Sequence, residues 1–312
     1  MLIKYVHHAD IDKDKWDRCI DNAMNGLIYG YSYYLDIMSK NWDALVMNDY
    51  EAVMPLTRNK KFGISYLRQP VFTQQLGIFA PAFVESDITN AFMKKVLEEF
   101  SFAEINWNYA NSCSHATGMR VNNILLLDRS FNDIQKNFKS DFVKKIKSND
   151  LIYEIGEDVE EVISLFIKYY SKRIHVSTED YQNLFRLYLL LNKKEQLFIR
   201  KVSSQDGQLL SIAIFLRDSR RIYYVLSVTL PEGRKEQSNY FLLYHAIKEY
   251  SNQNLIFDFE GSDIPSIQLF FKKFGGLEQP FPFVRINRLP FFLSVVKRVY
   301  DYFKFGKEEE RL

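Results

Sequence analysis

Two carboxylates near the end of a predicted strand are the residues best placed to do chemistry. Residues 255–259 form an apolar run that contains Asp258, and Glu260 and the turn residue Gly261 follow it directly. Pro265 then marks the first turn of a helix, where its missing N–H removes no hydrogen bond. Carboxylates beside a turn glycine at a strand end are a common location for active-site chemistry in mixed α/β proteins.

The elements that would position these carboxylates occur twice in the same order. Each half of the sequence predicts two strands joined by a tight turn, a third strand, a helix and a further strand. In the first half these are residues 43–47, 51–57, 64–67, 86–100 and 102–107; in the second they are 196–202, 208–216, 221–228, 239–251 and 255–259. Corresponding elements lie about 150 residues apart, a domain-sized spacing, so we interpret the pattern as a duplication.

A basic amphipathic helix is predicted between the halves, over residues 131–149. Phe131, Ile134, Phe138, Phe142 and Ile146 follow one helical stripe. Lysines occupy its other faces, and among them Lys144 and Lys145 could contact phosphate or a polynucleotide backbone; a solvated helix face is the alternative. Helices at 159–174 and 178–192 open the second half, as 12–22 and 31–39 open the first.

Motifs in both halves resemble the FemAB-like branch of the GNAT acyltransferase superfamily. In the second half the matching residues are Asp258, Phe259, Gly261, Pro265, Phe270, Lys272, Phe274 and Gly275. In the first half they are Pro70, Thr73, Gln74 and Gly77. The resemblance implies an α+β fold of two tandem GNAT-like lobes, each a mixed β-sheet flanked by helices. We place the N-terminal lobe at residues 1–128, the connecting basic helix at 129–150, the C-terminal lobe at 151–287 and a helical tail at 288–312.

The resemblance also implies where an acyl donor binds. In a GNAT-type lobe two parallel strands splay apart, here 221–228 and 255–259, and the donor's phosphates meet N–H groups at the start of the next helix. The matching turn contains the candidate donor contacts Arg234, Lys235, Gln237, Ser238 and Asn239. Coenzyme A users commonly have small residues at the positions of Gln237 and Asn239, so this turn departs from their pattern.

Transfer of an acyl group to an amine needs a base and a group that stabilises the oxyanion. Glu260, nearest the Gly261 turn, is the candidate base, with Asp258 as a second carboxylate and Tyr224 as the candidate oxyanion donor; a solvated or salt-bridged glutamate is the alternative for Glu260. For the acceptor, Arg58 and Arg68 flank the first-half motif and can hold a carboxylate together with Gln74, or can tie the lobes together.

Composition excludes several other classes of protein. The 41 basic and 39 acidic residues leave a net charge of +2, which argues against a strong, uniform nucleic-acid-binding field. The two cysteines and five histidines lack metal-ligand spacing, so no metal site is expected. We find no secretory signal and no apolar run long enough to span a membrane, which predicts a cytoplasmic protein. Residues 288–307 predict an amphipathic helix that packs on the body or lies on an anionic membrane.

These observations predict an acyl- or aminoacyltransferase that acts by direct attack of an amine at a cleft between two lobes. No permanently bound cofactor is expected; acyl-CoA or aminoacyl-tRNA would be the co-substrate, and the lysine patch would contact the tRNA. The alternative is a non-catalytic GNAT-fold protein that binds a peptide, a glycan precursor or a membrane partner. The oligomeric state is left open.

Overall fold

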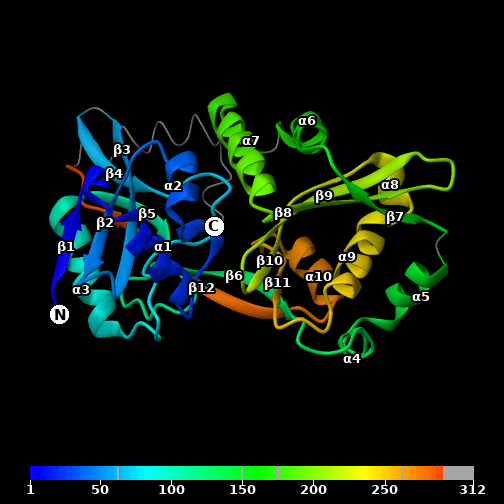
Figure 1. Ribbon diagram of the computed structural model, residues 1–312, viewed down its shortest axis with the longest axis horizontal. Helices are drawn as coiled ribbons and strands as arrows, with labels where there is room; N and C mark the ends of the chain where they lie inside the picture. Colours follow the sequence, from blue (N-terminus) through cyan, green and yellow to red (C-terminus); the bar gives the residue numbers. More distant parts are fainter. Residues whose placement is uncertain (62, 149, 173, 175, 262, 291–312) are drawn as a thin grey trace. The chain divides into compact units, whose positions relative to one another are not determined.

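The computed structural model describes residues 1–61, 63–148, 150–172, 174, 176–261 and 263–290, apart from the side chains of residues 141, 145, 147 and 148. The chain divides into two compact units (Figure 1). Unit 1 contains Met1–Met119, Arg173–Ser177 and the chain from Pro282 onward. Unit 2 contains Arg120–Lys172 and Thr178–Phe281. Each unit is built on a mixed β-sheet with helices, so the predicted α+β class is confirmed.

The sheet of unit 1 is an antiparallel meander extended by one parallel strand. Its strands are β1 (Ile3–Val6), β2 (Trp42–Met47), β3 (Ala52–Lys61), β4 (Ile64–Arg68) and β5 (Phe102–Asn106). β1 to β4 pair antiparallel in sequence order, β5 joins β4 in parallel, and the end of β12 (Leu277–Asn287) pairs antiparallel with β5. The helices are α1 (Lys13–Asn22), α2 (Ser32–Met38) and α3 (Ser86–Glu99), with short 3₁₀ turns η1 (His8–Asp10) and η2 (Ile28–Gly30).

Unit 2 repeats this strand order. Its strands are β7 (Ile152–Gly156), β8 (Leu197–Ser203), β9 (Leu209–Arg217), β10 (Arg221–Thr229), β11 (Ile256–Asp258) and β6 (Gly118–Leu126). β7 to β10 pair antiparallel, β11 joins β10 in parallel, and β6 pairs antiparallel with β11. The helices are α4 (Phe131–Gln135), α5 (Ser140–Ser148), α6 (Val159–Tyr170), α7 (Thr178–Lys193), α8 (Pro231–Lys235), α9 (Ser238–Glu249) and α10 (Pro265–Lys272).

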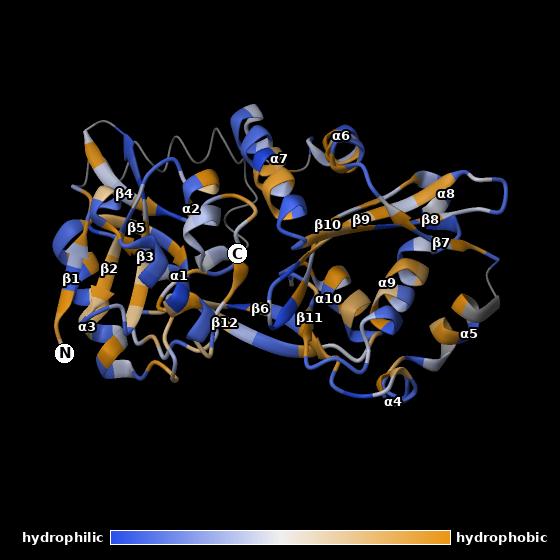
Figure 2. Ribbon diagram, viewed as in Figure 1, coloured by the Kyte–Doolittle hydropathy of each residue, from blue (hydrophilic) through white to orange (hydrophobic). Residues whose placement is uncertain are grey.

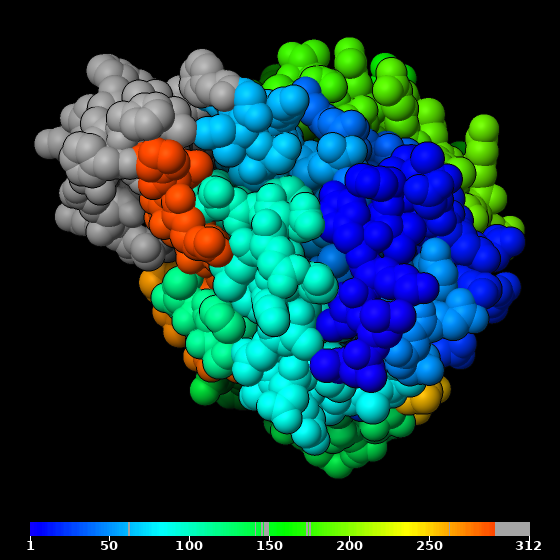
Figure 3. Space-filling view, turned by 90° about the vertical axis from the view of Figure 1, so that its left-hand side faces the viewer, coloured from blue at the N-terminus to red at the C-terminus, as the bar shows by residue number. Residues whose placement is uncertain are grey.

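The sixth strand of each sheet comes from outside its own half of the sequence. β6 follows the elements of unit 1 along the chain but pairs with β11 of unit 2, through Asp258 opposite Ile124. β12 follows the elements of unit 2 but pairs with β5 of unit 1, through Val284 opposite Ile105. Figure 3 shows the residues just before Pro290 beside the segment that contains α3, and Arg288 donates a hydrogen bond to the Leu97 carbonyl there (3.0 Å). The sequence patterns had predicted neither strand.

Apolar residues alternate along the strands and gather on the helix faces that meet them (Figure 2). In unit 2, α9 packs on β8 and β9, while α6 packs on β9 and β10 from the opposite side of the sheet (Figure 1). The core under α9 is aromatic: Phe215, Phe257, Phe259, Phe271 and Phe274 are all buried in it. These rings tie β9, β11 and α10 together, which holds the ends of β10 and β11 on a rigid base.

The helix predicted at 131–149 is wrong as a single element, because it is broken into α4 and α5. The predicted stripe is still buried, with Phe138 and Phe142 both packed on Phe274. The break comes from a long-range contact: the Lys139 N–H donates to the carbonyl of Lys273 instead of to its own helix (2.9 Å). A local periodicity cannot report that competition. The predicted tail at 288–312 lies outside the described residues beyond Pro290.

In unit 1, asparagine side chains fasten the loop that carries the first-half motif. Asn111 accepts a hydrogen bond from the N–H of Ile78 and donates to its carbonyl, at 2.8 and 2.9 Å. Gly77, just before Ile78, has a φ of +91°, and a Cβ on it would lie 2.7 Å from Asn111 Oδ1 and 2.9 Å from the backbone N of Asn108. The motif glycine is therefore required both by backbone conformation and by contact.

We expect Gly77→Ala to lower the free energy of unfolding by about 2 kcal/mol more than Gly63→Ala does. Gly63 also has a positive φ (+79°), but no atom lies within 4 Å of the position of its Cβ, so it controls for backbone strain alone. Urea denaturation of both variants measures the difference. Equal losses would show that the asparagine contacts do not constrain Gly77.

Candidate functional site

β10 continues past the point where its pairing with β11 ends. The two strands pair in parallel only at Arg221–Ile256, Ile222–Phe257 and Tyr223–Asp258. β10 then runs on to Thr229, bonded to β9 on its other side, with a register shift between Tyr224 and Leu226. Such a bulge bends a strand and increases its twist. In the described residues, the β11 side of β10 beyond Tyr223 therefore carries no ladder partner from β11.

The chain turns away from β10 immediately after β11. Glu260 has a φ of +58°, an unusual value for a residue with a side chain, and Gly261 follows with a φ of +22°. A Cβ on Gly261 would lie 2.4 Å from the carbonyl oxygen of Val121 on β6. Close packing against β6 thus requires glycine at 261, while Glu260 accepts a strained backbone conformation.

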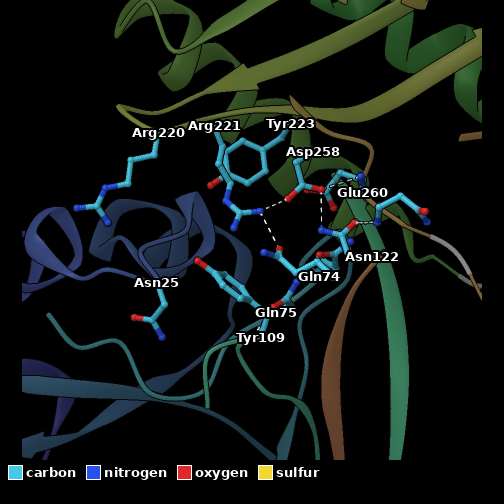
Figure 4. Close-up of polar contacts among 12 residues, drawn as sticks. Asn25, Gln74, Gln75, Tyr109, Asn122, Arg220, Arg221, Tyr223, Asp258 and Glu260 are labelled. Atoms are coloured by element: carbon cyan, nitrogen blue, oxygen red, sulfur yellow. Dashed lines mark hydrogen bonds and ion pairs between the residues drawn. The ribbon is translucent and has the colours of Figure 1, made fainter. Parts of the chain in front are cut away.

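A buried polar cluster lies where the pairing between β10 and β11 ends (Figure 4). The Arg221 guanidinium lies 2.8 Å from Asp258 Oδ2, and both side chains are only 2% exposed. Asp258 Oδ1 accepts hydrogen bonds from Asn122 Nδ2 and from the Glu260 N–H, each at 2.9 Å. Arg221 also donates to Gln279 Oε1 (3.1 Å). The Asp258 carboxylate is therefore held by donors from β10, β6 and its own turn.

A second buried carboxylate supports the start of β10. Asp218 accepts hydrogen bonds from the N–H groups of Arg220 and Arg221 (2.8 and 2.7 Å) and from the Tyr223 hydroxyl (2.6 Å). Burial raises the pKa of the Asp218 carboxyl, and these hydrogen bonds only partly oppose that effect. Asp218 thus fixes the turn before β10 to the backbone of Arg221 and to the side chain of Tyr223.

Tyr224, the predicted oxyanion donor, already donates its proton. Its hydroxyl donates to Asn239 Oδ1 at 2.8 Å, and its ring packs on Phe215 and Phe271. Burial raises the pKa of this hydroxyl to about 12, so it stays protonated at neutral pH. Asn239 lies in the first turn of α9, so the contact fixes the N-terminus of α9 to the bulged part of β10.

The predicted donor turn forms α8 and the start of α9. Gln237 caps α9 with a φ of +56°, and Ser238 behind it is buried, with no hydrogen-bond partner for its hydroxyl. Arg234 and Lys235 are exposed, as a phosphate contact requires. Next to α8, however, a cavity of about 490 Å³ is lined by four carboxylates, those of Asp150, Asp206, Glu232 and Glu236, together with Lys235. This side of the turn therefore has no excess of positive charge.

The predicted acceptor residues belong to unit 1. Arg58 Nε lies 2.6 Å from Oδ2 of Asp43, a buried carboxylate that also binds the Tyr5 hydroxyl. Arg68 is exposed at the end of β4, and the Gln74 side chain accepts a hydrogen bond from Gln75 Nε2 (2.6 Å). Arg58 thus takes part in an ion pair within unit 1, and the acceptor role of all three residues stays a prediction.

Of the predicted lysine patch, Lys144 is exposed on α5, whereas the side chain of Lys145 lies outside the described residues. Across the described part of the chain, no three His, Cys, Asp or Glu side chains are grouped as a metal site would need. Within the same residues, none of the helices is both long and apolar enough to cross a membrane.

Sequence reasoning missed Arg221 and Asn122. The sequence could have indicated Arg221, because an arginine that begins the apolar strand Ile-Tyr-Tyr-Val needs an anionic partner once that strand is buried. Asp258, in the short buried strand β11, carries the complementary charge. Asn122 had no such signal, since its strand β6 follows unit 1 in the sequence but pairs with unit 2.

We expect Asp258→Ala to lower the free energy of unfolding by about 3–5 kcal/mol, because it leaves the Arg221 guanidinium buried without its anion. Glu278→Ala is the control: it breaks the exposed Lys272–Glu278 pair of the same unit and should cost less than about 1 kcal/mol. Chemical denaturation compares the two variants. A cost for Asp258→Ala no larger than that of the control would contradict a tightly coupled pair.

Asp218 predicts a pH dependence of stability. A carboxyl whose pKa is raised by folding binds its proton more tightly in the folded state, so its contribution is present below the unfolded pKa of about 4 and is lost as the pH rises through the folded pKa. Relative to wild type, Asp218→Asn should therefore become progressively more stable as the pH rises from 4 to 7. Asp206→Asn should show the opposite sign, because hydrogen bonding to Ser204 lowers the pKa of Asp206. Urea denaturation from pH 7 down to about pH 3 checks both signs, because the Asp218 effect develops above the unfolded pKa of about 4 and the Asp206 effect develops mainly below it.

Comparison with known proteins identifies the fold. Residues 145–265 match the family model described as an acetyltransferase (GNAT) domain. The fold is similar to that of FemX, with a TM-score of 0.64 and 13% identity over 94% of this chain and 99% of FemX. It is also similar to the C-terminal domain of a candidate lysylphosphatidylglycerol synthetase from Agrobacterium fabrum (TM-score 0.50, 10% identity, 93% and 98% covered).

A conserved protein of unknown function from Bacteroides thetaiotaomicron is similar to the same extent (TM-score 0.50, 10% identity, 90% and 99% covered). A search among curated proteins found no match. Residues 145–265, which make up part of unit 2, thus match a GNAT acetyltransferase domain, and the two-unit α+β fold of nearly the whole chain is similar to that of FemX.

Proposed function

We propose that this protein transfers an acyl or aminoacyl group to an amine by direct attack, and that unit 2 binds the donor. The observation that carries the proposal is the part of β10 that extends beyond β11. An extended donor arm can add hydrogen bonds to such a strand edge, in the way a peptide adds to the edge of a sheet. The bulge after Tyr224 and the turn at Glu260 keep β11 from covering this edge.

The corresponding part of unit 1 is built differently, which supports a donor site in unit 2. β4 ends at Arg68, soon after its parallel pairing with β5 begins. The chain's own following segment then lies along the continuation of β5, with parallel bridges from Leu76 to Trp107 and from Val84 to Asn111. The duplicated strand order thus leads to an extended β10 in one unit and to a self-filled position in the other.

The N-terminus of α9 is the second element of the proposed donor site. Helix N-termini favour anions, and Arg234 and Lys235 add positive charge beside this one. Glu232 and Glu236 alternate with them on α8, so the local charge is balanced. Gln237 and Asn239 occupy positions where a bound pyrophosphate needs close backbone approach, which favours an aminoacyl ester over acyl-CoA as the donor. A tRNA donor would make contact through Lys144 and Lys145.

Hydrogen–deuterium exchange with each donor class tests the site. We expect a non-hydrolysable aminoacyl-tRNA or acyl-CoA analogue to slow exchange of the β10 amides from residue 224 to 229. Strand β7 (Ile152–Gly156) is the control, since it is the last strand of the same sheet, three strands from β10, and should not change. Radiolabelled donors and a panel of amine acceptors then report transfer. Binding without labelling of any amine would favour the non-catalytic alternative, and protection confined to other elements would contradict the β10 site.

A further inference from the structure

We infer that Asp258 is a positioning residue and that it holds Glu260 in the conformation needed for proton transfer. The inference rests on the proposed function and assigns separate roles to the two candidate carboxylates. Glu260 would be the group that exchanges a proton with the amine, and Asp258 would act only through the backbone of Glu260.

The Asp258 side chain is poorly placed to meet a substrate. It is 2% exposed, and its two oxygens already accept hydrogen bonds or ion-pair contacts from Arg221, Asn122 and the Glu260 N–H. A carboxylate that is buried and has three donors cannot reach an amine without losing contacts that offset the cost of its burial. Asp258 therefore makes its contacts with groups of the protein and not with a substrate.

Glu260 is held where the strands part. Its backbone has a φ of +58°, a conformation that disfavours residues with a Cβ. Asp258 Oδ1 accepts its N–H at 2.9 Å, an Asx-type contact that stabilises this conformation two residues on. Strained residues retained by surrounding contacts occur disproportionately at active sites. Glu260 is also more exposed than Asp258, and it lies two residues after Asp258, which forms the last pair between β11 and β10.

The proton transfer balances without any further reactant. The amine nitrogen attacks the donor's carbonyl carbon, a C–N bond forms, and the bond from that carbon to the donor's sulfur or oxygen breaks. One amine proton passes to the Glu260 carboxylate. Glu260 then gives this proton to the departing sulfur or oxygen, which regenerates the carboxylate. Charged side chains on the elements around Glu260 include Asp258, Arg221 and the Arg120–Asp263 pair, in which Arg120 Nε and Asp263 Oδ2 lie 3.8 Å apart.

Kinetics of two conservative variants test the division of roles. Glu260→Gln should lower kcat by roughly 100-fold or more with little change in KM, and should abolish the acidic limb of the pH profile of kcat/KM. Asp258→Asn should lower kcat by a smaller factor and keep that limb. Loss of the limb in Asp258→Asn, or a wild-type rate in Glu260→Gln, would overturn the inference.

A strain control separates backbone effects from chemistry. Glu260→Gly removes the carboxylate and relaxes the positive φ, so it should raise Tm by roughly 2 °C while kcat falls as in Glu260→Gln. Glu195→Gly relaxes an equivalent φ of +57° at the end of α7 and should raise Tm similarly without changing kcat. A kcat unchanged in Glu260→Gly would contradict a catalytic carboxylate.

Amide exchange tests the positioning contact even if no transfer activity is found. Asp258→Asn should speed exchange of the Glu260 amide about tenfold, because a neutral amide oxygen accepts a weaker hydrogen bond than a carboxylate. Asn122→Ala leaves the Arg221 ion pair intact and serves if Asp258→Asn fails to fold; it should produce a smaller acceleration at the same amide. Unchanged exchange in the variants would overturn the positioning role, whereas wild-type inactivity with every donor would overturn the proposed function and the proton-transfer role of Glu260 but not the Asp258 contact.

Discussion

The buried ion pair between Arg221 and Asp258 is the interaction on which the rest of unit 2 depends. Two charges removed from water are tolerated when other polar groups replace the hydrogen bonds lost from water, and here Asn122, Gln279 and a backbone N–H supply three such contacts. The pair joins the first residue of β10 to the last residue of β11. It therefore sets the point at which the two strands stop running together.

The features of the candidate site lie beyond the last pair between β10 and β11. Beyond it, β11 turns back through Glu260 and Gly261, while β10 bends through a bulge and continues along β9. The aromatic core under α9 packs on both strands, so neither strand can move toward the other without breaking packed ring contacts. Tyr224 links the bulged part of β10 to the start of α9 through Asn239. The buried ion pair, the residue with positive φ and the Tyr224–Asn239 hydrogen bond thus lie within a few residues of the end of the β10–β11 pairing.

The two units show how one strand order can serve different ends. Both have an antiparallel meander, a parallel fifth strand and a sixth strand from elsewhere in the chain. The difference lies in the fourth strand: β10 has nine residues, whereas β4 has five and is followed by a segment that lies along the continuation of β5. Strand length and the path of one loop therefore distinguish a unit whose fourth strand extends beyond its parallel partner from one whose own chain lies along the corresponding position.

Alternation of apolar residues and turn signals such as Asp206-Gly207 determined most of the elements, their order and the fold class, because these patterns report local geometry. The same patterns singled out Asp258 and Glu260. Only the tertiary structure decided that Asp258 is tied to Arg221, that Tyr224 is tied to Asn239, that Lys273 interrupts the helix after Phe131, and that β6 and β12 complete sheets at a distance. Each of these depends on a contact between residues far apart in the sequence, and such a contact leaves no periodic trace in either segment.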